Sequence, residues 1–586
     1  MAFHLCAAFT KLSFGRNHVA RQRNGNVVGR YNCMAGSSNS NQITVRRTAH
    51  YKPTIWDYDF VQSLKSEYEG EKFTERVKEL KEEVKMMMLN KNMVPLEKLE
   101  LIDTLQRLGI AYHFSDEIKT VLKSIYNHTV NNWMKEDLYA AALQFRLFRQ
   151  HGFKLSQEMF DFFLDELGNF KKCHCEDFKG LLSLYEASYV LEEGENVLEV
   201  ARKFTTISLQ KHTQLNKNHY LSILISQSLE VPLHWRMLRF ESRWFIDVYE
   251  QKQDMNPLLL QFAKLNFNIV QAMHLDDLKY TARWWRNTGL GEHLKFARDR
   301  IVENFLWTVG VIFEPQFGYF RRMATKVNAL ITTIDDIYDV YGTLDELQQF
   351  TDAVQRWDVN AMEQLPYYMK LCFLTLHNSI NQIAYDPLKE QGIYSIPYLK
   401  KAWADICKCY LLEAKWHYNG YTPSFEEYMD NAWISISAPV ILVHAFFLLK
   451  NPITNDALKC LNEYPRIIRY SSTILRLADD LGTSSDEVKR GDVPKSIQCY
   501  MHETGVSEEK AREHIRSLIC ETWKKMNKER VADDSPFSDT FIGVVVNLAR
   551  MALYMYQYGD GHGNNEEGKT KDRVMSLLIH PIPIQI

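Results

Sequence analysis

Acidic residues are absent from the beginning of this chain. No Asp or Glu precedes Asp57, although residues 1–45 carry several basic side chains among Ser, Asn and Gly. A basic, acid-free segment without a long apolar stretch is typical of an organelle transit peptide rather than of a secretory signal. We therefore leave residues 1–45 out of the fold and predict that they direct import into a plastid or a mitochondrion; the alternative is a disordered tail.

Long apolar runs and an excess of charge are lacking as well. The longest apolar run, residues 440–449, is about half the length of a membrane span and contains His444, so it predicts a buried helix and no transmembrane segment. The 70 basic and 73 acidic residues give a net charge of -3, which offers no general surface for nucleic acid. An anionic partner must therefore bind at a local site, and the sequence indicates no obligate protein partner.

The cysteines follow no pattern of a disulfide framework, because the ten residues are scattered along the chain. The cluster Cys173-His174-Cys175 and the pair Cys407/Cys409 each lack a matching second half at zinc-finger spacing. We predict that the cysteines are reduced thiols with structural roles.

Glycine is sparse, with 25 residues, and sustained alternation of apolar and polar residues is hard to find. Apolar residues instead recur at helical spacing. Leu101, Leu105 and Leu108 form one such stripe, and Gly109 supplies a stop signal just past it. The sequence therefore predicts an all-α protein.

A chain of 586 residues is too long for a single hydrophobic core, which argues for two large domains or three small ones. The polar stretch at residues 251–257 separates two long helical regions and is the best candidate for a linker. We predict an N-terminal helical domain over residues 46–256 and a C-terminal domain over residues 257–586. The motifs described next lie in the C-terminal domain, apart from one basic pair, so the N-terminal domain is predicted to be a scaffold.

Two aspartates, Asp335 and Asp339, lie four residues apart in the run DDIYD. On an α-helix both carboxylates project from one face about a turn apart. Such a pair on an otherwise apolar segment is costly unless a cation neutralises it, and hard oxygen ligands suit Mg²⁺ or Mn²⁺. A solvated acidic helix face is the alternative for this motif taken alone.

A second acidic run, DDLGTSSDE, strengthens the metal hypothesis. Asp479, Thr483 and Glu487 stand at positions i, i+4 and i+8, so a continuous helix would align their oxygens in one stripe. Asp480 lies about 100° away and is predicted to support the ligands from behind or to face solvent. Two such stripes facing each other would bracket divalent ions, and a diphosphate would complete their coordination.

Basic residues stand near both motifs. Arg298 precedes the first motif, Arg476 lies three residues before Asp479 on nearly the same helix side, and Lys495 follows Glu487. The planar guanidinium group suits phosphate oxygens. Each of these side chains alone would be taken for a surface charge, but together they predict a site for the departure of a diphosphate.

In combination these motifs resemble those of plant class I terpene synthases. The resemblance rests on DDIYD, on DDxxTxxxE, on the RDR triplet at residues 298–300, and on the RR pair at residues 46–47 followed after eight residues by Trp56. Within the family the chain is similar to the angiosperm monoterpene synthases, which carry a transit peptide before this RR(x)8W element. The likeness covers residues 46–586. It implies an N-terminal α-barrel without catalytic activity, a C-terminal class I terpenoid synthase α-bundle, and a plastid location.

The resemblance also implies roles for individual residues. Three Mg²⁺ or Mn²⁺ ions would be held by Asp335, Asp339, Asp479, Thr483 and Glu487. The diphosphate would be bound by Arg298, Arg476 and Lys495. Arg46 and Arg47 would help to close the site. The cavity, where aromatic faces can stabilise a carbocation, would be lined by Trp307, Tyr556 and His562.

A helix break is predicted at Ser437-Ala438-Pro439, inside the apolar stretch of residues 433–449. Pro439 lacks a backbone N–H and therefore frees an upstream carbonyl oxygen. In the family this break borders the cavity, commonly with Gly before the proline. Ala438 departs from that pattern, so we expect a pocket of altered shape.

Competing families fit less well. A trans-type prenyltransferase repeats DDxxD, a class II cyclase needs DxDD, and an HD-type hydrolase needs a His-Asp dipeptide, and none of these features occurs here. A helical scaffold protein would explain the amphipathic helices but not the two acidic stripes. We therefore predict a monoterpene synthase that ionises geranyl diphosphate to an acyclic or cyclic product. The alternative is a sesquiterpene synthase acting on farnesyl diphosphate.

Overall fold

The computed structural model describes residues 46–128, 136–215, 220–491, 493–562 and 568–584, without the side chains of residues 128, 213–215 and 485–490. The predicted transit peptide lies outside the described residues. Within the described ranges no β-strand forms, and the single β-bridge joins Leu164 to Phe170. The predicted all-α class is confirmed.

The helices divide into an N-terminal and a C-terminal set. The first set comprises α1 (Tyr58–Ser63), α2 (Glu71–Met88), α3 (Pro95–Arg107), α4 (Ser115–His128), α5 (Leu138–Gln150), α6 (Phe178–Ala187), α7 (Asn196–Leu215), α8 (Tyr220–Glu230) and α9 (Leu238–Tyr249). The second set comprises α10 (Pro257–Thr288), α11 (Leu290–His293), α12 (Ile301–Val311), α13 (Gly318–Asp336), α14 (Leu344–Arg356), α15 (Tyr367–Gln391), α16 (Ile396–Asn419), α17 (Phe425–Ser435), α18 (Ala438–Leu448), α19 (Asn455–Asn462), α20 (Arg466–Arg490), α21 (Ser496–Thr504), α22 (Glu508–Arg530), α23 (Asp539–Met555) and α24 (Lys569–Val574).

Helix α3 shows how local sequence sets an element. It begins with a proline at its first position, where the missing N–H costs nothing, and the Glu97 carboxylate accepts a hydrogen bond from the Val94 N–H at 3.1 Å. Leu101 and Leu105 on its apolar stripe are buried. The helix stops where Gly109 adopts a left-handed φ of 72°. The stop predicted at this glycine is confirmed.

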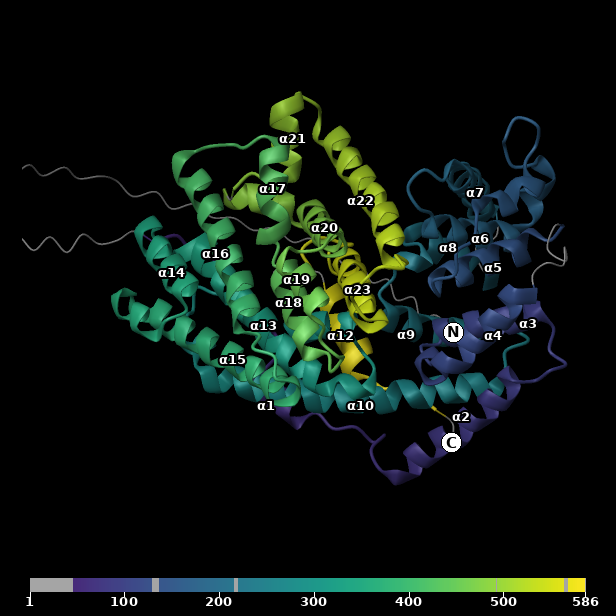
Figure 1. Cartoon of the computed structure of the whole chain (residues 1–586), viewed down its shortest axis with the longest axis horizontal. Helices are drawn as coiled ribbons and strands as arrows, with labels where there is room; N and C mark the ends of the chain where they lie inside the picture. Colours follow the sequence, from purple (N-terminus) through teal and green to yellow (C-terminus); the bar gives the residue numbers. More distant parts are fainter. Residues whose placement is uncertain (1–45, 129–135, 216–219, 492, 563–567, 585–586) are drawn as a thin grey trace, which may run out of the picture. The chain divides into compact units, whose positions relative to one another are not determined.

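Helix α10 links the two sets. Its 32 residues give it a length of roughly 48 Å, and it contacts α2 at one end and α12 and α13 at the other. Figure 1 shows it extending from the C-terminal helices toward α2. One hydrophobic core runs through both sets, from Trp56 to Ile582. The predicted domain boundary falls between α9 and α10 and stays a prediction.

The apolar stretch predicted to be a buried helix, residues 440–449, lies in α18 and its C-cap. Residues Phe425–Leu448, comprising α17 and α18, are the only stretch among the described helices that is long and apolar enough to cross a membrane, and 78% of an apolar 18-residue part of it is buried in the protein. Nearly all of α18 is buried, as predicted. The helix break is also confirmed, because Ser437 adopts a left-handed φ of 73° between the two helices.

Candidate active site

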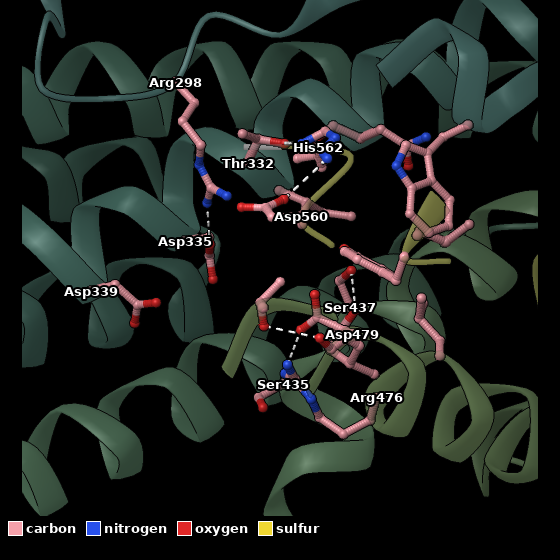
Figure 2. A pocket seen from close by; sticks show the side chains of 18 of the residues that line it. Arg298, Thr332, Asp335, Asp339, Ser435, Ser437, Arg476, Asp479, Asp560 and His562 are labelled. Atoms are coloured by element: carbon pink, nitrogen blue, oxygen red, sulfur yellow. Dashed lines mark hydrogen bonds and ion pairs between the residues drawn. The ribbon is translucent and has the colours of Figure 1, made fainter. Parts of the chain in front are cut away.

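One cavity receives both acidic motifs. Asp335 reaches it from the end of α13 and Asp339 from the turn that follows α13, whereas Asp479 and Thr483 reach it from α20. Figure 2 shows Asp335 and Asp339 on one side and Asp479 on the other, with the open space between them. The described members of the two stripes therefore line one cavity, as predicted, whereas the placement of the Glu487 side chain stays a prediction. The contacts of α13 and of α20 with α18 hold the helices in this arrangement.

The helix under the first motif is not a regular α-helix. Helix α13 ends at Asp336, and a π-helical turn, η7 (Ile337–Tyr341), carries Asp339. The expectation of a regular α-helix through both aspartates is therefore wrong, because Asp339 lies in a π turn, which has more residues per turn than an α-helix. Both side chains line the cavity nevertheless. Such π turns are frequent at functional sites.

Arg298 is fixed by the aspartate that does not line the cavity. The fully buried Asp336 accepts hydrogen bonds from the Arg298 backbone N–H at 2.7 Å and from its Nε at 2.9 Å. The Arg298 Nη2 donates to Asp335 at 2.5 Å. Burial raises the pKa of Asp336, although the Arg298 charge opposes the shift. Asp336 thus positions Arg298 beside the first motif.

The second motif repeats this arrangement. The Arg476 guanidinium is ion-paired with Asp479 and, at 2.8 Å, with Asp480. Asp480 is fully buried and accepts hydrogen bonds from the Tyr428 hydroxyl at 3.0 Å and the Ser496 N–H at 3.1 Å. The sequence left open whether Asp480 supports the ligands from behind or faces solvent. Its burial agrees with support of the ligands and excludes exposure to solvent. Burial raises the pKa of Asp479 to about 6; Arg476 opposes this shift, and Asp480 adds to it.

The remaining predicted diphosphate and metal groups are partly described. Thr483 lines the cavity and donates a hydrogen bond to the Asp479 carbonyl at 2.9 Å. Lys495 also lines the cavity, 3.9 Å from the buried Glu413 carboxylate. Helix α20 continues through Glu487, as the i+8 argument requires, but the side chain of Glu487 lies outside the described residues.

The donors suit a shared metal site rather than one formed by protein ligands alone. Among the described side chains, no three His, Cys, Asp or Glu residues lie close enough together to hold an ion. Mg²⁺ usually takes one or two carboxylates and fills its remaining positions with water and substrate phosphates. Opposed carboxylates of Asp335, Asp339 and Asp479 meet that demand. The residues present therefore fit hard divalent cations.

Aromatic and neutral groups form another part of the wall. The rings of Trp307 and Tyr556 lie with centroids 6.0 Å apart, and both line the cavity. His562 lines it as well, with its Nε2 3.3 Å from the Thr332 hydroxyl (Figure 2). Burial and the charges of Arg298 and Arg300 lower the pKa of His562 well below its usual value. The imidazole is therefore neutral and adds no charge to the cavity.

The N-terminal strap, residues 46–56, lies against the C-terminal helices. Arg46 makes a bidentate ion pair with Glu346 on α14, at 2.8 and 2.7 Å, and donates to the Tyr341 carbonyl at 3.0 Å, at the end of the π turn that carries Asp339. Arg47 contacts the His417 ring at 2.8 Å. Farther along, Trp56 donates through Nε1 to the buried Glu303 at 3.1 Å.

Comparison with known proteins decides the family. Residues 55–229 match the N-terminal domain of terpene synthases, and residues 286–525 match the metal-binding domain of the terpene synthase family. The chain is 71% identical to terpene synthase 10 of Ricinus communis over 93% of this chain and 99% of that relative. It is 63% identical to a (-)-alpha-terpineol synthase of Vitis vinifera over 94% of this chain and 93% of the relative. The chain belongs to the terpene synthase family.

Solved structures agree with this assignment. A limonene synthase bound to 2-fluorolinalyl diphosphate superposes on this terpene synthase with a TM-score of 0.89 and 48% identity, over 92% of this chain and all of that one. An isoprene synthase from grey poplar leaves, bound to three Mg²⁺ ions and a thiolodiphosphate, superposes with a TM-score of 0.84 and 45% identity. The match covers 90% of this chain and 99% of that one. The two-domain all-α fold and a divalent metal cofactor follow for this terpene synthase.

Several polar groups of the cavity escaped the sequence argument. They come from five different elements or connections and carry no local motif: Asn304, Asn328, Tyr410, Ser435 and Asp560. Asp560 accepts a hydrogen bond from the His562 N–H at 3.1 Å, which fixes the segment after α23. Arg300, in the RDR triplet, does not line the cavity of this terpene synthase; it donates to the Lys52 carbonyl at 2.9 Å and so ties down the strap.

Proposed function

We propose that this terpene synthase is a monoterpene synthase that ionises geranyl diphosphate with release of diphosphate. Two acidic arrays facing each other across one cavity carry the proposal. The names of similar proteins support the substrate class, among them the (-)-alpha-terpineol synthase of Vitis vinifera and a chloroplastic myrcene synthase of Quercus ilex that is 61% identical over 97% of this chain. A sesquiterpene synthase acting on farnesyl diphosphate remains the alternative.

The metal ligands would be Asp335 and Asp339 on one wall and Asp479, Thr483 and Glu487 on the other. Mg²⁺ or Mn²⁺ would serve, since both prefer oxygen donors, and three ions are expected. When bound, these ions neutralise the diphosphate and promote its departure. Arg298 and Arg476, each already held by a buried aspartate, would orient toward the diphosphate without reorganisation, together with Lys495.

Water exclusion falls to the strap and the cavity walls. An allylic cation is captured by water unless the site is closed, so Arg46 and Arg47 would hold the strap over the helices during turnover. The faces of Trp307 and Tyr556 would stabilise the cation without reacting with it. The neutral His562 would not repel it.

Residues 1–45 would act as a plastid transit peptide. The absence of acidic residues supports this function, as do similar proteins named as chloroplastic, such as the gamma-terpinene synthase of Citrus limon, at 58% identity over 94% of this chain. Fusing residues 1–45 to a fluorescent protein and locating the fusion in leaf cells tests this targeting function. Fluorescence in the cytosol would refute it.

Product analysis tests the proposed reaction. The purified protein is incubated with geranyl or farnesyl diphosphate and Mg²⁺ or Mn²⁺, the volatile products are separated by gas chromatography, and released diphosphate is measured. We expect C10 products from geranyl diphosphate, no turnover with a chelator, and a much lower kcat/KM for farnesyl diphosphate. A higher kcat/KM for farnesyl diphosphate would establish the sesquiterpene alternative.

A further inference from the structure

A second cavity, of about 270 Å³, lies between the N-terminal and C-terminal helices. Its wall combines side chains of α3, α5 and α9 with side chains of α22 and α23. It shares no lining residue with the active-site cavity. Since one water needs only about 10–15 Å³ by this measure, the cavity has room for a small solvated ligand.

The wall of this cavity is rich in arginine. Five arginines line it, against three carboxylates: Arg107, Arg146, Arg236, Arg530 and Arg550 against Asp103, Glu241 and Glu314. Isolated charges are costly to bury, so arginines that share an enclosed space are normally each paired with a carboxylate. The excess of two positive charges therefore requires an explanation.

Three of the arginines have internal partners. Glu241 accepts hydrogen bonds from Arg107 at 2.9 Å and from Arg236 at 2.7 Å. Arg146 is paired with Asp103 at 2.7 Å. The pairs of Arg107 and Arg146 join α3 to α9 and to α5, and two of the three carboxylates are thus structural ties. Arg236 also lies 3.7 Å from the Glu186 carboxylate, outside the wall.

The other two arginines make no ion pair with any described residue. Arg530, the last residue of α22, donates through Nη2 to the Arg149 carbonyl at 2.9 Å, and its Nε is buried without a partner in the described structure. Arg550 donates through Nε to the His234 carbonyl at 2.8 Å and through Nη1 to Asn547 at 2.9 Å. Neutral acceptors thus fix both guanidinium groups in place. Burial lowers the pKa of Arg530 to about 10 and outweighs the Glu192 charge, which favours the charged form of Arg530.

The two charges also act on each other. Burial lowers the pKa of Arg550 to about 9, and repulsion by Arg530 contributes to that shift. The third carboxylate, Glu314, makes no ion pair with either arginine among the described residues. Burial raises its pKa, and the charges of Arg321 and Arg239 oppose that shift. The end of α22 places Arg530 at the negative pole of that helix, which offsets only part of one charge.

We propose that this cavity binds a phosphate-type oxyanion, held by the guanidinium groups of Arg530 and Arg550. Two arginine forks fixed by backbone carbonyls and facing a common space suit the several oxygens of phosphate or diphosphate. Such an anion bridges the end of α22 and the middle of α23 to the N-terminal helices and stabilises their packing. Free phosphate and the diphosphate released in the proposed reaction share this chemistry.

The test compares anion-dependent stability in wild-type protein and an Arg550→Gln variant. The Tm is measured at constant ionic strength in chloride, in millimolar phosphate and in millimolar diphosphate, with a chelator present so that no metal-bound diphosphate occupies the active site. Binding is measured in parallel by calorimetry. Arg356→Gln, which removes an exposed arginine paired with Asp352 on α14, serves as the matched control.

The expected pattern has two parts. In chloride, Arg550→Gln keeps or raises the Tm, because it relieves the repulsion of Arg530. With phosphate or diphosphate, the Tm of the wild type and of Arg356→Gln rises, whereas the rise is lost in Arg550→Gln and the dissociation constant increases at least about tenfold. Arg550→Lys should restore part of the rise. A response to diphosphate alone would assign the site to the reaction product.

Two results would overturn the proposal. One is an equal rise in Tm for wild type and Arg550→Gln, since a general salt effect requires no site. The other is a lower Tm of Arg550→Gln in chloride with an unchanged response to the anions, which would make Arg550 a structural residue only.

Discussion

Individual carboxylates in the two motifs do different work. Asp335 and Asp339 line the cavity, whereas Asp336 and Asp480 are fully buried and hold Arg298 and Arg476. A DD pair therefore combines one group that faces the ligand with one that positions an arginine. The reason is geometric, because consecutive residues on a helix point about 100° apart.

The first prediction concerns the cavity-facing pair. Asp335→Ala or Asp339→Ala should reduce kcat for geranyl diphosphate by at least about a thousandfold, because each removes a proposed metal ligand. The melting temperature should change little, since neither carboxylate supports the core. Steady-state kinetics and calorimetry measure both. Asp352→Ala, on the exposed face of α14, is the control. Normal activity of either variant at saturating Mg²⁺ would contradict the metal assignment.

The second prediction separates Glu487 from Asp480. Glu487→Gln should raise the Mg²⁺ concentration needed for half-maximal activity and leave the Tm unchanged. Asp480→Asn should leave the Mg²⁺ requirement unchanged. It should lower the free energy of unfolding by about 1–3 kcal/mol, because it weakens buried hydrogen bonds to Arg476, Tyr428 and Ser496. A shift of the Mg²⁺ requirement in Asp480→Asn and not in Glu487→Gln would refute the stripe argument.

At the scale of elements, the break between α17 and α18 sets part of the cavity wall. Ser435, Ile436 and Ser437 all line the cavity, and Ser437 carries the left-handed φ that turns the chain there. A left-handed conformation costs a non-glycine residue about 1–2 kcal/mol. A glycine at position 437 would avoid this cost.

The third prediction follows from this backbone. Ser437→Gly should keep or raise the Tm, and Ser437→Val should lower the free energy of unfolding by about 1–2 kcal/mol, since a β-branched residue fits a positive φ poorly. Both should change the proportions of the products, because the hydroxyl borders the cavity. Differential scanning calorimetry and gas chromatography provide the measurements. Equal stability of the Gly and Val variants would mean that the left-handed turn is absent.

The fourth prediction concerns the docking of the strap on α14. Glu346→Gln keeps the capping box with Thr343 but removes the charge that pairs with Arg46. Hydrogen exchange over residues 46–56 should become faster, and kcat/KM for geranyl diphosphate should fall several-fold, as expected for the loss of about 1 kcal/mol. Glu363→Gln, an exposed acid outside the strap contacts, is the control. Unchanged exchange would show that this ion pair does not dock the strap.

The pH dependence of the strap has a definite sign. Burial alone would raise the pKa of Glu346, but hydrogen bonds from Arg46, Thr343 and Tyr368 outweigh it and hold the pKa at about 2, below its usual 4.5. The stabilisation is therefore complete above pH 4.5 and is lost only as the pH falls toward 2. Hydrogen exchange of the strap at pH 5, corrected for intrinsic rates, should match that at pH 7.5.

On the scale of the whole molecule, the strap joins segments far apart in sequence. Residues 46–56 contact α14, α16 and the start of α12 through Arg46, Arg47 and Trp56. The fifth prediction compares two truncations. A chain starting at Arg46 should match the full-length protein in activity and Tm. A chain starting at Asp57 should lose most turnover of geranyl diphosphate and about 1–3 kcal/mol of stability, because the buried Glu303 loses the Trp56 hydrogen bond.

Linalyl diphosphate distinguishes closure from folding. If the product is cyclic, the shorter chain should retain more activity on this already isomerised substrate, because the closed pocket matters most while the cation isomerises. If the product is acyclic, the activity on both substrates should fall by a similar factor. The double variant Arg46→Ala/Arg47→Ala in the longer chain keeps Trp56 and serves as the control. Full activity of the shorter chain on both substrates would show that the strap has no part in closure.

The sequence alone determined the helical class, the two acidic stripes and the residues that precede them, because helical periodicity and metal-ligand spacing are local properties. It could not determine that Asp336 and Asp480 are buried anchors or that a π turn carries Asp339, since burial depends on which helices pack against a segment. It also gave no sign that Asn304, Tyr410 and Asp560 share the cavity. The meeting of α3, α5 and α9 with α22 and α23 around unpaired arginines likewise appeared only in the folded chain, because such contacts join residues hundreds of positions apart.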